Sequence, residues 1–220
     1  MNRKALIAEF IGTFALIFIG VGAIASNHFS GGQSGLVGIA LAHGLTIACM
    51  ASATGAISGG HLNPAVSIGL FFTKKIDAAH TIGYVVAQCL GAVAAAFMIK
   101  LCLPKEVLAA VNMGTPALAP GITAIMGLIT EIILTFFLVF VICGTAVDRR
   151  APPMGGLFIG LAVTLDIFVG GPITGAAMNP ARHLGPALLG GGLGQLWIYW
   201  VGPVIGGILG AVVYDKTLAE

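Results

Sequence analysis

The chain has 220 residues, of which 58% are hydrophobic and only 8% are Asp, Glu, Lys or Arg, and its formal net charge is +2. Soluble domains contain about 25% charged residues, so these figures exclude a soluble catalytic domain and leave no basic patch for nucleic acid. Residues 10–73 and residues 183–214 contain no Asp, Glu, Lys or Arg at all. A helix needs roughly 20 apolar residues to cross the hydrocarbon core, and the chain therefore has room for about six crossings joined by short loops.

In chain order, the apolar segments predict membrane helices over residues 4–26, 34–56, 78–102, 121–146, 154–170 and 194–214. The first segment imitates a signal peptide, but Glu9 lies inside its apolar stretch and argues against cleavage. Residues 57–76 and 171–193 are apolar, yet Gly and Pro interrupt them and leave too few helical residues for a crossing. We expect each of these two segments to form a re-entrant loop followed by a half-helix.

The two re-entrant segments carry related sequences. Residues 58–65 read Ser-Gly-Gly-His-Leu-Asn-Pro-Ala and residues 174–181 read Thr-Gly-Ala-Ala-Met-Asn-Pro-Ala, an offset of 116 residues. Residues 8–14 match residues 130–136 at an offset of 122, and residues 84–91 match residues 199–206 at an offset of 115. These collinear matches predict a single transmembrane domain built from repeats over residues 1–105 and 121–220, joined by a loop over residues 103–120.

The predicted orientation follows from the repeats and from the basic residues. Each repeat supplies three crossings, an odd number, so the second copy enters from the opposite face and the repeats are inverted. Lys and Arg are concentrated in cytoplasmic loops, which predicts cytoplasmic N- and C-termini and an extracellular loop over residues 103–120. On this orientation seven basic residues lie inside and two outside: Arg3, Lys4, Lys74, Lys75, Arg149, Arg150 and Lys216 against Lys100 and Lys105.

Asn-Pro at the head of an apolar run is a helix start, because Asn is a strong N-cap and Pro suits the first helical position. Two inverted half-helices would then meet inside the bundle with their partially positive N-termini facing each other. Such a centre disfavours a cation, whereas neutral water can accept hydrogen bonds from the Asn63 and Asn179 amides. The loop carbonyls ahead of each start are expected to form a ladder of acceptors: those of Gly59, Gly60, His61, Gly175, Ala176 and Ala177.

These motifs resemble those of the aquaporin, or major intrinsic protein, family. The resemblance covers essentially the whole chain and includes both Asn-Pro-Ala motifs (Asn63, Pro64, Ala65 and Asn179, Pro180, Ala181), the following Arg182, and the Ala-Glu-Phe-Ile-Gly-Thr-Phe opening at residues 8–14. It implies an all-α bundle of six transmembrane helices and two re-entrant half-helices, which assembles as a homotetramer with one pore per protomer. It implies a passive water channel in the lipid bilayer, without a cofactor or a metal. The pairs Gly156/Gly160 and Gly206/Gly210 fit close helix crossings.

The resemblance also assigns a selectivity filter to four residues: His43, Ile167, Ala176 and Arg182. This set departs from the water-selective pattern, which has an aromatic residue first and His second, and from the glycerol pattern, which has Trp first. It is similar to tonoplast intrinsic proteins and other members that pass ammonia as well as water. We therefore expect permeability to water and to ammonia or other small neutral solutes. A glycerol or small-polyol facilitator is the alternative, although His183 and the Tyr199-Trp200 pair favour the water type.

The isolated charges support a pore. Arg182 facing lipid would cost at least about 2.5–3.5 kcal/mol, so a pore-lining position is expected. The resemblance implies that Glu9 and Glu131 hold the re-entrant loops. Asp166 is adjacent to the filter position Ile167, and it is expected either to hydrogen-bond nearby loop or helix backbone or to act as a pH-sensitive gate. A proton-coupled transporter using Asp166, Glu9 and Glu131 is a second, weaker alternative.

The remaining expectations concern histidines, chemistry and location. His61 lines the inner vestibule or bonds its own loop, and His28, His80 and His183 are expected at the periphery. The sequence lacks H-E-x-x-H or another hydrolase constellation, so an enzyme is not expected. The short termini and the lack of a targeting signal favour a prokaryotic inner membrane.

Overall fold

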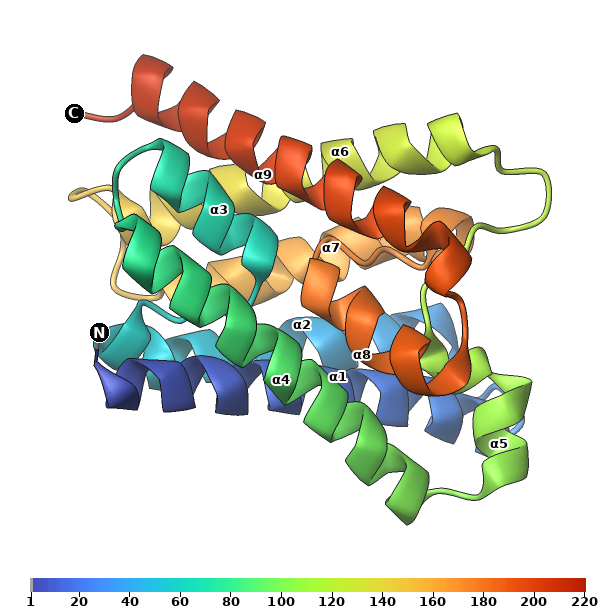
Figure 1. Cartoon of the computed structure of the whole chain (residues 1–220). Helices are drawn as coiled ribbons and strands as arrows, with labels where there is room; N and C mark the ends of the chain where they lie inside the picture. Colours follow the sequence, from blue (N-terminus) through green and yellow to red (C-terminus); the bar gives the residue numbers. More distant parts are fainter. Residues whose placement is uncertain (1) are drawn as a thin grey trace.

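The computed structural model describes residues 2–220, and over that range the chain forms a bundle of helices without any β-strand (Figure 1). Six helices in this range are long and apolar enough to cross a membrane. They are α1 (Arg3–Phe29), α2 (Gly35–Ser58), α4 (Ala78–Cys102), α6 (Ala124–Ile142), α7 (Gly155–Thr174) and α9 (Leu196–Thr217). Helix α6 continues as a π-helical turn over Cys143–Val147, and a 3₁₀ turn over Leu193–Gln195 precedes α9. The prediction of six crossings is confirmed.

Two shorter helices lie between the long ones and do not cross the bundle. Helix α3 (Pro64–Phe72) points toward the end that carries both chain termini, and α8 (Pro180–Gly190) points toward the opposite end (Figure 1). Each begins as expected, because the Asn63 side chain accepts a hydrogen bond from the Ala65 N–H at 2.9 Å and the Asn179 side chain accepts from the Ala181 N–H at 3.0 Å. The expectation of two half-helices is confirmed.

The predicted helix ends need correction at the second re-entrant segment. Helix α7 runs to Thr174 rather than residue 170 and passes through Pro172, so the loop before α8 is short. The helix stops where Gly175 adopts a left-handed conformation, with φ of 80°. Helix α2 stops in the same way at Gly59, with φ of 88°. Glycine takes this conformation without a Cβ penalty. A glycine therefore ends both helices, whereas Pro172 does not end α7.

The loop predicted over residues 103–120 is also more ordered than expected. It contains the short helix α5 (Lys105–Ala110) and a 3₁₀ turn, η1 (Asn112–Gly114). Three consecutive residues of this turn are left-handed, with φ of 46° at Asn112, 54° at Met113 and 65° at Gly114. The sequence did not predict this turn, because tertiary contacts rather than local preference hold two non-glycine residues in a conformation that costs roughly 1–2 kcal/mol each.

Close helix crossings hold the bundle together. A Cβ atom at Gly160 of α7 would overlap the carbonyl oxygen of Gly44 in α2, and one at Gly206 of α9 would overlap the carbonyl oxygen of Ile132 in α6. Small residues let helix backbones approach this closely, and lipid-embedded helices gain their packing energy there. The expected crossings at Gly156/Gly160 and Gly206/Gly210 are therefore observed, whereas large apolar side chains remain exposed on the outer surface.

A hydrogen-bonded clamp fixes the loop between α6 and α7 to the C-terminal end of α9. The Arg150 guanidinium donates to the Asp148 carboxylate at 2.7 Å and to the Leu218 carbonyl at 2.7 Å. The Tyr214 hydroxyl donates to the same carboxylate at 3.1 Å. Hydrogen bonds from Arg150 hold the pKa of Asp148 well below its ordinary value. The clamp lies at the end of the bundle where Figure 1 places both chain termini.

Candidate functional site

A buried glutamate from α1 holds the first re-entrant loop. Glu9 has no exposed surface and accepts hydrogen bonds from four donors. Two are backbone N–H groups, those of His61 at 2.9 Å and Leu62 at 2.6 Å. The others are the Ser58 hydroxyl at 2.6 Å and the Gln88 amide at 2.7 Å. A carboxylate within an apolar bundle is costly unless it is fully hydrogen-bonded, and here the end of α2 and the loop after it supply three of the donors.

A second buried glutamate, from α6, holds the second loop in the same way. Glu131 accepts hydrogen bonds from the Thr174 hydroxyl at 2.6 Å, the Ala177 N–H at 2.9 Å and the Met178 N–H at 2.7 Å. A tyrosine hydroxyl completes each loop, because Tyr84 donates to the Ser58 carbonyl at 2.9 Å and Tyr199 donates to the Thr174 carbonyl at 2.7 Å. The two loops are thus built from equivalent contacts.

The two loops differ in one support. The position equivalent to Gln88 in the second copy is Pro203, which has no side-chain donor. The position equivalent to Ser67 is His183, which was expected at the periphery. That expectation is wrong: His183 is fully buried and stacks on Tyr199 with ring centroids 4.2 Å apart. Aromatic packing therefore occupies the space that the Gln88 and Ser67 hydrogen bond fills in the first half.

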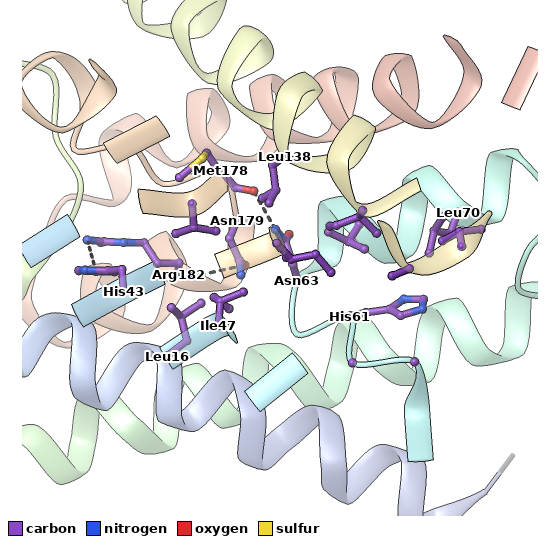
Figure 2. A pocket seen from close by; sticks show the side chains of 18 of the residues that line it. Leu16, His43, Ile47, His61, Asn63, Leu70, Leu138, Met178, Asn179 and Arg182 are labelled. Carbon is purple, nitrogen blue, oxygen red and sulfur yellow. Dashed lines mark hydrogen bonds between the residues drawn. The ribbon is translucent and has the colours of Figure 1, made fainter. Parts of the chain in front are cut away.

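The loops and half-helices enclose a cavity of about 360 Å³ inside the bundle (Figure 2). At the end carrying the chain termini its lining includes Lys75, Ile76, Ala146 and Val147. Further in, one wall is apolar and the other is the backbone of the re-entrant loops. The apolar wall includes Leu16, Ile47, Val66, Leu138, Ile159 and Val163. A separate pocket of about 310 Å³ lies toward the α5 end, and His43, Ile167 and Arg182 line both spaces. These three residues, with Ala176 beside them in the larger cavity, mark the boundary between the two spaces.

The two asparagines meet at the centre of the cavity. The Asn63 amide donates to the Met178 carbonyl at 2.8 Å, and the Asn179 amide donates to the Leu62 carbonyl at 2.9 Å. Figure 2 shows both side chains in the cavity wall. Each amide has two N–H donors. Each asparagine therefore donates one hydrogen bond to the opposite loop, and its second N–H is available to a solute in the cavity. The sequence predicted free amides but not this reciprocal contact.

His43 and Arg182 face each other at the boundary. Imidazole Nδ1 of His43 lies 2.8 Å from the Ile39 carbonyl, which can only accept, so Nδ1 carries the proton and Nε2 offers a lone pair. Arg182 Nη2 lies 3.4 Å from that Nε2, a contact drawn as a dashed line in Figure 2. Arg182 Nη1 donates to the Gly114 carbonyl at 2.8 Å. Gly20 leaves room for the imidazole, because a Cβ there would overlap the ring. Both side chains are buried, at 3% and 5% exposure.

The Gly114 carbonyl is a site contact that the sequence did not reveal. It comes from the left-handed η1 turn in the outer loop, and nothing in the spacing of that loop connects it to Arg182. The other expectations for single residues have mixed outcomes. His61 lines the cavity, as one of its two readings expected, and its Nδ1 lies 3.0 Å from the hydroxyl of Ser67 in α3 rather than from its own loop.

In the part of the chain that the structure describes, Asp166 does not make the hydrogen bond to backbone that was one of its two expected roles. Within residues 2–220 its Oδ2 atom is buried without a hydrogen-bond partner, so the expected bond to backbone is not made there. In the same range, the residues that line the cavity do not include Asp166, Glu9 or Glu131. No group of three His, Cys, Asp or Glu side chains among the described residues is placed to hold a metal ion.

A bundle of membrane-length helices around a narrow cavity, with two half-helices meeting at its middle, defines a passive transmembrane channel for small solutes. Comparison with known proteins agrees, because a sequence profile described as "Major intrinsic protein" matches residues 1–214. The chain belongs to the major intrinsic protein family, the aquaporins, which are channels for water and small solutes rather than enzymes.

Individual relatives give the same result. Aquaporin TIP4-4 of Zea mays is 45% identical over 96% of this chain and 85% of its own length. Nodulin-26 of Glycine max is 40% identical over 99% of this chain and 81% of its own length. The X-ray structure of the aquaglyceroporin from Plasmodium falciparum superposes with a TM-score of 0.87 at 28% identity, covering 98% of this chain and 96% of that one. The two sequence relatives come from plants, which does not match the expectation of a prokaryotic membrane.

Proposed function

We propose that this channel conducts water and ammonia, with His43, Ile167, Ala176 and Arg182 as its selectivity filter. The observation that carries the proposal is that the lone pair of His43 Nε2 and the fixed positive charge of Arg182 lie side by side at the boundary between the two cavities. His43 Nε2 accepts hydrogen bonds there, and Arg182 donates them. Water and ammonia each have a lone pair and N–H or O–H groups, so either can bond both residues. Ammonium has no lone pair, and the charge of Arg182 repels it.

The other two filter residues favour ammonia by their size and polarity. Ile167 presents an apolar side chain and Ala176 only a methyl group, where a ring or a longer polar side chain would narrow the passage and bind water more strongly. Within residues 2–220, the lining of the two cavities contains no Phe, Tyr or Trp. A glycerol facilitator needs an apolar aromatic surface against which the carbon chain of the solute packs. The filter therefore supports small solutes over polyols.

Two barriers are proposed against ions and protons. The N-terminal ends of α3 and α8 each carry about half a positive charge, and both lie at Asn63 and Asn179 in the cavity wall. Arg182 adds a full charge at the boundary toward the outer pocket. The loop carbonyls of Gly59, Gly60, His61, Gly175 and Ala177 are proposed as acceptors that carry solute between these points. An Arg182→Val channel should conduct ions or protons above the wild-type level, and an unchanged ion conductance would remove this barrier from the mechanism.

Passive transport fits the buried acids better than proton coupling does. Glu9 accepts four hydrogen bonds and Glu131 accepts three, so both carboxylates are committed to the loops. A proton relay needs acids that meet the permeation path, and the described cavity lining is made by other residues. We assign both glutamates to loop support.

Stopped-flow entry of ammonia into proteoliposomes with an internal pH dye tests the substrate. The comparison uses protein-free liposomes and a triple variant, His43→Phe, Ile167→His and Ala176→Thr. Alkalinisation in wild-type vesicles should be faster than in both controls, while osmotic water flow persists in all channel-containing vesicles. Equal ammonia rates for the wild type and the triple variant, with water flow intact, would refute the ammonia assignment and leave a water channel.

Assembly and orientation are part of the same proposal. We propose a homotetramer with one pore per protomer, built from inverted repeats over residues 1–105 and 121–220, with cytoplasmic termini. The equivalent hydrogen bonds of Glu9 and Glu131 support the repeat, and both termini lie at one end of the bundle in Figure 1. Exposed apolar side chains around the bundle are available to lipid or to neighbouring protomers. Chemical cross-linking in vesicles should give a product of four chains. Recovery of the single chain alone, without cross-linked products, would count against the tetramer.

A further inference from the structure

A basic pocket lies away from the permeation path, at the end of the bundle that carries α5. It has a volume of about 470 Å³, and its lining includes Lys100, Lys105, Asn112, Met113 and Leu189. The two lysines come from the last turn of α4 and the first turn of α5, while Leu189 comes from the end of α8. On the orientation proposed above, this is the outer rim of the membrane.

The pocket presents two ammonium groups without a carboxylate partner. Lys100 donates one hydrogen bond to the Leu189 carbonyl at 3.2 Å, which leaves two of its three N–H donors. Among residues 2–220, no carboxylate lies within ion-pair distance of Lys100 or Lys105, whereas Lys75 at the other end is paired with Asp215 at 3.0 Å. Glu106 is exposed and is not part of the lining. The net positive charge of the pocket lining therefore favours an anion.

The surroundings of the pocket indicate which anion. Exposed apolar side chains lie within one helical turn of its lining residues on α4 and α8, with Phe97 at 55%, Leu101 at 66% and Leu188 at 48% exposure. Acyl chains would cover these side chains in a bilayer, while a headgroup would reach the two lysines at the interface. We propose that this pocket binds the phosphate of an anionic phospholipid, whose chains lie along α4 and α8.

The same pocket adjoins the selectivity filter through one turn of backbone. Asn112 and Met113 line it, and the next residue, Gly114, supplies the carbonyl that holds Arg182. Asn112 and Met113 are non-glycine residues in a left-handed conformation, which makes the turn costly to maintain without external contacts. A bound headgroup restrains this turn and with it the position of the Arg182 guanidinium. This coupling rests on the proposed role of Arg182 in the filter, but lipid binding itself does not.

Native mass spectrometry of the full chain tests the site. The detergent-solubilised protein is titrated with phosphatidylglycerol, with phosphatidylcholine and with inorganic phosphate. The variant is Lys100→Gln with Lys105→Gln, and the matched control is Lys4→Gln with Lys74→Gln, an equal charge change at the opposite end. Each lysine at an anionic surface contributes about fivefold in affinity, so the pocket variant should bind phosphatidylglycerol about 25-fold more weakly, and the control should bind as the wild type does.

Each outcome decides the proposal. Equal phosphatidylglycerol affinity in the wild type and the pocket variant would overturn the site. Binding of inorganic phosphate as tight as that of phosphatidylglycerol, or equal binding of phosphatidylcholine, would overturn an anionic lipid as its occupant. Hydrogen exchange at the Gly114 and Thr115 amides, which bond the Val111 and Asn112 carbonyls, reports the coupling. Phosphatidylglycerol should slow both amides in the wild type but not in the pocket variant; unchanged exchange would refute the coupling. None of these readouts measures permeation, so a failure here is distinct from a failure of the proposed ammonia transport.

Discussion

Replacing Glu131 by Gln tests the loop support most directly. The carboxylate accepts three hydrogen bonds, from the Thr174 hydroxyl and from the Ala177 and Met178 N–H groups. A glutamine amide has a single oxygen, which can keep Thr174 and Ala177. Its NH₂ group would then face the Met178 N–H, donor against donor.

The magnitude follows from that one orphaned contact. A hydrogen bond to a charged acceptor is worth about 1.5–3 kcal/mol, and a buried unsatisfied N–H costs about 1–3 kcal/mol. These terms overlap, so the expected loss is about 2–4 kcal/mol, equivalent to roughly 4–16 °C in unfolding temperature for a chain of this length. The loop carries Ala176 and the Met178 carbonyl that binds Asn63, so water permeability per channel should also fall.

Two further variants sharpen this experiment. Glu106→Gln makes the same charge change at an exposed position of α5 and should leave both readouts unchanged. Glu9→Gln should be destabilising by at least as much, because the new amide faces the Leu62 N–H and the Gln88 amide, and turning Gln88 so that Oε1 accepts from it would break the Gln88–Ser67 hydrogen bond. Unfolding is followed by fluorescence in detergent and permeability by stopped-flow light scattering. If Glu131→Gln matched the wild type in both, the loop would not depend on this carboxylate and our reading of it would be refuted.

Three other predictions follow from the packing, the backbone and the clamp. Gly160→Leu should abolish folded, monodisperse protein, because a Cβ there overlaps backbone across the helix crossing, whereas Gly22→Leu, with open space around it, should express normally; equal yields would contradict this packing. Ala176→Gly should raise stability by about 0.5 kcal/mol, because Ala176 has a φ of 44°, while Ala177→Gly should lower it; unfolding temperatures that fall equally would argue against strain. Asp148 has a depressed pKa, so its stabilisation is present above its ordinary pKa of about 4 and is lost as pH falls further; Asp148→Asn should shrink the difference in unfolding temperature between pH 7 and pH 3, and an unchanged difference would exclude the clamp.

Much of the site was readable from the sequence because its signals are local. An Asn-Pro pair starts a helix wherever it stands, and a repeated Asn-Pro-Ala in two apolar segments predicted both half-helices. Glu9 and Glu131 were expected to hold the loops, and each now has backbone donors from its own repeat. The boundaries were less accurate, because a left-handed glycine, not Pro172, ended α7.

Tertiary structure alone decided the contacts between distant segments. The Asn63 amide bonds the Met178 carbonyl and the Asn179 amide bonds the Leu62 carbonyl, and neither contact follows from the repeated motif. The burial of His183 against Tyr199 and the hydrogen bond from Arg182 to the Gly114 carbonyl likewise join segments that local sequence does not connect. The number of crossings, the helix starts and the residues available to line a pore were predictable from the sequence, since hydrophobicity and capping act within a few residues. Which donors remain free, and which backbone carbonyl holds Arg182, depends on how the helices close around the cavity, because a hydrogen bond is fixed by distances that only the packed bundle sets.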